Sequence, residues 1–148
     1  MDPVVLTLDG NSLAHRAYHA YRARSASISD PYGRPASAVY GFLALFAAVC
    51  DKVRGRYGRL DAVIVGFDDP TSSWRRSVYA GYKAHRSEKD PALVDQLAAL
   101  PKLLNELGIV TIVPDGLEAD DVVASVAAVA EQRQWRCVIA TSDRDAFS

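Results

Sequence analysis

Short apolar runs alternate with longer segments of helical spacing along this chain. The runs are rich in β-branched residues and predict four strands: VVLTLD, AVIVGFD, GIVTIVP and CVIATSD. Apolar residues recur at threes and fours in segments 37–53 and 92–108, which predicts two helices, and segment 118–133 predicts another. Pro101 predicts a kink or a helix start within the second of these segments, and Gly108 predicts its end.

Continuous apolar strands that alternate with helices predict a parallel sheet with helices on both faces. The chain has 148 residues, the size of one ordinary domain, and 49% of them are hydrophobic, which argues against disorder. Segment 25–37 contains Ser, Gly and Pro and predicts a loop.

The charges are unevenly distributed, although the net charge is only −1. Basic residues collect between Lys52 and Lys89, and acids dominate from Asp115 to Asp145. Cys50 and Cys137 stand in apolar runs, which favours free thiols in a reducing compartment over a disulfide. We find no signal peptide and no apolar stretch near the ~20 residues that span a membrane, so we expect a cytoplasmic protein.

Acidic residues follow the predicted strands. TLD, GFD and TSD end three of them, and the fourth leads into PDGLEADDVV. A helix N-terminus attracts one or two acids, which leaves the others unexplained. Asp69 and Asp115 are interpreted as turn residues. The carboxyl ends of parallel strands meet at one edge of a sheet, so we expect seven acids to gather there: Asp9, Asp68, Glu118, Asp120, Asp121, Asp143 and Asp145.

Carboxylates this close together repel one another unless a cation lies between them. An all-oxygen set favours Mg²⁺ or Mn²⁺ over zinc. Because seven acids exceed what one such ion usually takes from a protein, the set predicts two ions, an arrangement that supports in-line displacement at phosphorus.

The segment WRRSVYAGYKAHR combines basic and aromatic residues. In a helix, Tyr79, Lys83 and Arg86 share one face, and Tyr82 neighbours Arg86. Such residues bind phosphate and stack on bases. The alternative is a solvated basic helix with its aromatic rings packed inward.

Several other chemistries lack their motifs. His15 and His19 have zinc-helix spacing, but Arg16 stands where HExxH needs Glu, and we instead expect Arg16 to reach a phosphate. There is no phosphate-binding glycine loop, no G-x-S-x-G elbow and no Cys–His pair for a covalent nucleophile. LDGNS lacks the second aspartate of haloacid dehalogenase phosphatases.

Six segments, in order through nearly the whole chain, resemble the bacterial 5′ nuclease family: LDGNSLAHRAYHA, AVYGF, AVIVGFD, RRSVYAGYKAHR, GLEADDVVAS and ATSDRD. These proteins are flap endonucleases or 5′–3′ exonucleases, either alone or as the N-terminal domain of DNA polymerase I. The resemblance implies a PIN-like (resolvase-like) α/β nuclease core over residues 1–148, with a mainly parallel sheet and helices on both faces.

The resemblance also implies a function in DNA replication and repair. The enzyme would hydrolyse DNA at 5′ ends and flaps, with RNA primers as a further substrate, by means of two Mg²⁺ or Mn²⁺ ions on the seven acids. Arg16, Lys83 and Arg86 match residues that hold the scissile phosphate. Tyr82 matches a residue that stacks on a base, and we add Tyr79 to the substrate-binding set. We expect a monomer that does not contact membranes.

Family members continue beyond this length into a helical DNA-binding region that supplies further aspartates to the second metal. The present chain stops at Ser148, so we expect little nuclease activity from it alone. Two alternatives remain open: a PIN-type ribonuclease, and a non-catalytic module that binds branched DNA.

Overall fold

The computed structural model describes residues 2–23, 29, 31–33, 36–70 and 91–141. The segment with Tyr79, Tyr82, Lys83 and Arg86 lies outside these ranges, as do Asp143 and Asp145. The elements, in chain order, are β1 (Val4–Asp9), α1 (Gly10–Ala23), α2 (Ser37–Tyr57), β2 (Ala62–Gly66), α4 (Pro91–Glu106), β3 (Val110–Ile112), α5 (Ala119–Gln132) and β4 (Arg136–Ala140).

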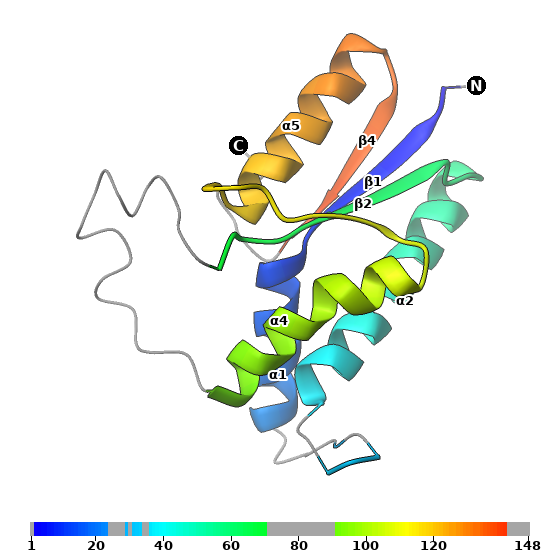
Figure 1. Ribbon diagram of the computed structural model, residues 1–148. Helices are drawn as coiled ribbons and strands as arrows, with labels where there is room; N and C mark the ends of the chain where they lie inside the picture. The colour runs from blue at the N-terminus through cyan, green and yellow to red at the C-terminus, as the bar shows by residue number, and fades with distance from the viewer. Residues whose placement is uncertain (1, 24–28, 30, 34–35, 71–90, 142–148) are drawn as a thin grey trace.

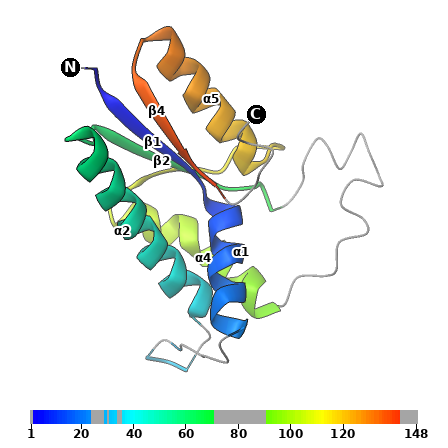
Figure 2. The same cartoon turned by 180° about the vertical axis from the view of Figure 1, so that it is seen from behind.

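The four strands form one parallel sheet in the order β3-β2-β1-β4, which confirms the predicted architecture. Helix α5 packs on one face, while α2 and α4 cover the other and α1 leaves the end of β1 (Figures 1 and 2). Side chains alternate along β1. Leu6 and Leu8 enter the core with Phe42 and Leu100, whereas Val5 points toward α5.

Two helix boundaries differ from the predicted ones. Helix α2 continues past residue 53 to Tyr57 and ends at Gly58, whose φ of 76° is left-handed and whose N–H donates to the Arg54 carbonyl. Its last turn carries Arg54 and Arg56, so the apolar pattern stops before the helix does. Pro101 lies inside α4, which begins ten residues earlier at Pro91. Gly108 follows the end of α4 with a φ of 81°, in agreement with its predicted role.

A buried glutamine joins α2 to α4. Ala36, the N-cap of α2, makes no side-chain capping bond. Instead, Oε1 of Gln96 accepts hydrogen bonds from the N–H groups of Ala38 at 2.7 Å and Val39 at 3.1 Å. Gln96 is only 4% exposed, and its Nε2 donates to the Ala92 carbonyl at 3.1 Å. This cap was missed from the sequence because its acceptor lies about sixty residues from the helix start.

Two glycines allow helices to start close to the end of β2. A Cβ on Gly66 would lie 2.7 Å from Cβ of Val122 on α5, and a Cβ on Gly10 would lie 2.6 Å from the Phe67 ring. Real Cβ atoms do not approach other atoms this closely. Both α1 and α5 therefore begin against β2 because residues 10 and 66 lack side chains.

Cys50 is buried, Cys137 is partly buried, and both are free thiols, as predicted. Burial raises the pKa of each thiol above its usual value. Among the helices in the described ranges, none is long and apolar enough to cross a membrane.

Candidate functional site

The carboxyl ends of the three longer strands lie level with one another. Leu8 of β1 pairs with Val65 of β2 on one side and with Ala140 of β4 on the other. Asp9 ends β1, and the residues that leave β2 and β4 emerge beside it. This edge is where ligands bind in open α/β sheets.

Asp9 caps the helix that follows it. Its side chain is 8% exposed, and its Oδ1 accepts a hydrogen bond from the Ser12 N–H at 3.0 Å. The Ser12 hydroxyl lies 3.4 Å from the Asp9 carbonyl oxygen and 3.1 Å from Oγ1 of Thr141. Because Thr141 directly follows β4, these contacts join the ends of β1 and β4.

Asp68 joins α1 to α5. Its backbone N–H donates to Oδ1 of Asn11 at 2.7 Å, and its own Oδ1 accepts from the Ala119 N–H at 2.8 Å. Asn11 lies in the first turn of α1, and Ala119 is the first residue of α5. Asp68 is thus oriented by contacts with both helix starts.

The start of α5 is a capping box made entirely of acids. Glu118 is the N-cap and is 6% exposed, and Asp121 is the third helical residue. Oδ2 of Asp121 accepts a hydrogen bond from the Glu118 N–H at 2.9 Å. Asp120 stands in the same turn, where the helix dipole favours negative charge.

Asp69 and Asp115, the two acids interpreted as turn residues, lie after β2 and in the loop before α5, respectively. Asp115 is exposed in a turn whose next residue, Gly116, has a φ of 71°. Oδ2 of Asp69 accepts from the Gly116 N–H at 2.7 Å, and the Asp69 N–H donates to the Leu117 carbonyl. Asp69 therefore fixes the turn from the end of β2.

Arg16 and the two histidines lie along α1, away from these contacts. Arg16 is exposed and lies six residues beyond Gly10, about 9 Å along the helix axis. The rings of His15 and His19 stack with their centroids 6.3 Å apart. In the part of the chain that the structure describes, no three His, Cys, Asp or Glu side chains are grouped closely enough to hold one metal ion.

The structure therefore places Asp9, Asp68, Glu118, Asp120 and Asp121 at the ends of neighbouring elements. All five offer oxygen, the donor that hard divalent ions prefer. Sequence reasoning missed Asn11 and Ser12, which contact Asp68 and Asp9, respectively. The polar residues of the segment DGNS, at the end of the first strand, could have indicated this role.

A parallel sheet with acids at its carboxyl edge defines an α/β protein with a candidate ligand site at that edge. The family model described as "5′-3′ exonuclease, N-terminal resolvase-like domain" matches residues 4–148. The chain belongs to this family, and the family resemblance seen in its sequence is confirmed.

Longer proteins contain the same domain. The thermostable DNA polymerase I of Thermus aquaticus is 40% identical over 144 residues, which cover 97% of this chain and 16% of that protein. A 5′-3′ exonuclease of Buchnera aphidicola is 29% identical, with 97% and 47% covered. The chain thus spans about half the length of this exonuclease and about a sixth of the polymerase.

A solved structure shows the same fold. It is a bacteriophage T5 flap endonuclease, crystallised as a pseudo-enzyme–product complex with DNA and metal ions. It superposes with a TM-score of 0.60 at 18% identity, covering 97% of this chain and 50% of that one. This likeness, together with the parallel sheet, confirms the predicted PIN-like fold.

Proposed function

We propose that this chain is the nuclease core of a structure-specific 5′ nuclease, a 5′–3′ exonuclease or flap endonuclease acting in DNA replication and repair. The observation that supports the proposal is a set of hydrogen bonds that join several elements at the carboxyl edge of the sheet. Hydrogen bonds link Thr141, Ser12 and Asp9, and a second set links Asn11, Asp68 and Ala119. These bonds join the ends of elements that carry acids, in a domain of the 5′-3′ exonuclease family.

The acids would hold two divalent ions, Mg²⁺ or Mn²⁺. The described part of the set is oxygen-only and includes two buried carboxylates, Asp9 and Glu118, which fits a hard cation. We assign to the set the seven acids Asp9, Asp68, Glu118, Asp120, Asp121, Asp143 and Asp145, of which the last two lie outside the described residues. When bound, such ions supply an activated water and neutralise charge at phosphorus.

The residues of the chain itself would bind and orient the substrate. Lys83, Arg86 and Arg16 would hold the scissile phosphate, with Tyr82 and Tyr79 stacking on bases. The substrate class is DNA with 5′ ends or flaps, with RNA primers included. We further propose that residues 1–148 form the catalytic core and that the protein acts as a monomer in the cytoplasm.

Metal binding tests the site without depending on catalysis. In Asp68→Asn, the amide oxygen can still accept from the Ala119 N–H, while the ligand charge is lost. We expect its Mn²⁺ affinity, measured by calorimetry, to fall by roughly tenfold or more. Asp115→Asn is the matched control, because Asp115 is an exposed turn residue at the same edge. Unchanged affinity in the first variant, or an equal loss in both, contradicts the proposed site.

Cleavage assays separate the proposed nuclease from its alternatives. The wild-type chain and Asp143→Asn are incubated with Mg²⁺ and matched DNA-flap and RNA substrates. Cleavage of DNA that is lost in the variant, with binding retained, supports the proposal. Cleavage of RNA alone indicates a PIN-type ribonuclease, and DNA binding without cleavage in either form indicates a binding module. We expect weak cleavage by the 148-residue chain, so the assay requires high enzyme concentration.

A further inference from the structure

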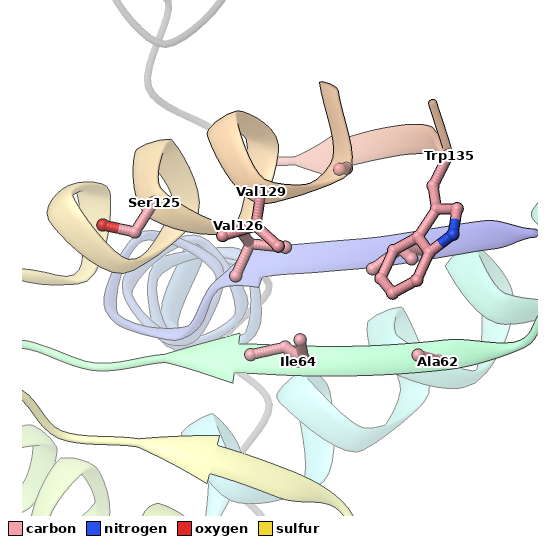
Figure 3. A pocket seen from close by; sticks show the side chains of 8 residues that line it. Ala62, Ile64, Ser125, Val126, Val129 and Trp135 are labelled. Carbon is pink, nitrogen blue, oxygen red and sulfur yellow. The ribbon is translucent and has the colours of Figure 1, made fainter. Parts of the chain in front are cut away.

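An apolar groove lies between α5 and the sheet, toward the amino ends of the strands. It has a volume of about 230 Å³. In Figure 3, Ala62 and Ile64 on β2 lie across from Val126 and Val129 of α5, with the Trp135 ring at one end. The lining side chains include no charged group, and their polar groups are the Ser125 hydroxyl and the Trp135 indole N–H.

The apolar surface beside the groove includes β3. Ile64 pairs with Val110, and Gly66 pairs with Ile112. Paired residues of a parallel ladder point to the same face, so Val110 and Ile112 face the same side as Ile64. They are 56% and 39% exposed, and Val129 across the groove is 44% exposed. An apolar strip therefore runs from α5 across β2 to the edge strand.

Parallel sheets are normally covered by helices on both faces. Helix α4 contacts β3 on one face, while α5 contacts β1, β2 and β4 on the other. On the α5 face, none of the described helices covers β3. We propose that this groove is the seat of one further helix, supplied by the part of family proteins that lies outside the region matched by this chain.

The length of the relatives favours that occupant. The aligned exonuclease and the T5 enzyme are each about twice as long as the matched region, so each contains polypeptide that could fill the position. A second copy of this chain is a poorer fit, because a stable interface between separate proteins needs roughly 800 Å² from each partner. A tethered helix binds at high effective concentration and needs less area.

The lining defines the chemistry of the helix. The added helix should present uncharged, aliphatic side chains at spacings of three and four residues to a surface that offers one hydroxyl. Ser125 to Val129 rises by about 6 Å along α5, so one to two turns of the added helix span the groove. No groove residue belongs to the carboxylate set, and this inference does not depend on the proposed nuclease function.

Hydrogen exchange tests the inference. The 148-residue chain is titrated with the polypeptide of about equal length that directly follows the matched region in the Thermus aquaticus relative. We expect slowed amide exchange in 110–112 and 125–130. Val129→Asp should weaken this binding at least tenfold, because it places a charge in an apolar contact. Val94→Asp is the matched control, since Val94 is also a helical valine, 45% exposed, on α4 in the opposite layer.

Each outcome decides for or against the inference. Protection of both segments that Val129→Asp removes and Val94→Asp retains supports it. Absence of protection at ~100 μM, or equal loss in the two variants, overturns it. Sedimentation of the chain alone provides a second measurement: concentration-dependent dimers that Val129→Asp abolishes would show that a second copy fills the groove.

Discussion

The acids at the two ends of the sheet accept hydrogen bonds from different kinds of donor. At the amino end, Arg59 donates to both oxygens of Asp61, at 2.8 and 2.6 Å, and the Val4 N–H donates to the same carboxylate at 2.7 Å. At the carboxyl end, backbone N–H groups hold Asp9, Asp68 and Asp121. A guanidinium neutralises a carboxylate, whereas a backbone N–H orients one of its oxygens.

The contacts of Asp61 give it a structural role. Asp61 ties the loop after α2 to the start of β1, and nearby the guanidiniums of Arg136 and Arg56 lie 4.8 and 5.5 Å from the centre of the Tyr57 ring. Counting acids in the sequence does not reveal which of them have such a structural role.

The largest effect should come from adding a side chain at Gly66, where β2 and α5 are in close contact. Gly66→Ala puts a methyl group 2.7 Å from Val122, so α5 must move, and we expect a loss of about 2–3 kcal/mol in the free energy of unfolding. Urea denaturation measures it. Gly55→Ala is the control, because its Cβ meets nothing within 4 Å in α2, and it should gain about 0.5–1 kcal/mol. Equal stability of the two variants would show that the close approach is unimportant.

A smaller effect should follow from opening the capping box at the carboxyl end. Asp121→Ala removes the acceptor of the Glu118 N–H, and we expect a loss of about 1 kcal/mol in thermal or urea unfolding. Asp121→Asn keeps an acceptor and should retain most of that stability. Under the proposed function, both variants should lose metal affinity, which would separate the capping role from the ligand role. Retention of metal affinity in Asp121→Asn would remove Asp121 from the ligand set.

The smallest effect should appear at the amino end and should depend on pH. Hydrogen bonds from Arg59 and the Val4 backbone lower the pKa of Asp61 in the folded protein. A lowered pKa contributes stability above the ordinary aspartate value of about 3.9, and that contribution disappears as pH falls through the lower folded value. The melting temperature of Asp61→Asn should therefore lie slightly below that of the wild type at pH 7. The difference should shrink as the pH falls below the ordinary aspartate value and through the lower folded one, and a difference that does not shrink would contradict this account.

Local sequence patterns predicted the elements well where periodicity was strong. The first strand was predicted at its observed bounds, Val4–Asp9, and the segment 118–133 corresponds to α5 with Glu118 as its N-cap. The helix boundaries were predicted less exactly where residues outside the apolar pattern continue a helix. Charged residues extend α2 to Tyr57, and Pro101 lies within α4.

The candidate site was less predictable than the fold. Strand ends identified Asp9 and Asp68, because the carboxyl edge follows from parallel strands alone. The sequence did not predict the contacts of Asn11, Ser12 and Asp69. Each of these residues contacts a partner more than forty positions away, so its role depends on how the strands and loops are arranged in space. The metal-ligand assignments remain predictions.

Gly10 and Gly66 have a consequence for how this domain tolerates mutation. Asp9 pairs with Gly66, and a Cβ on Gly10 would lie 2.9 Å from the Gly66 carbonyl oxygen, so backbone meets backbone where α1 and α5 begin. The spacing between the two helix starts is set by main-chain atoms together with the Phe67 ring and the Val122 side chain, which lie nearest to the two glycines. Apolar substitutions deeper in the core can change local volume and shift helices elsewhere, while substitutions at Gly10, Gly66, Phe67 or Val122 change the width of this edge directly.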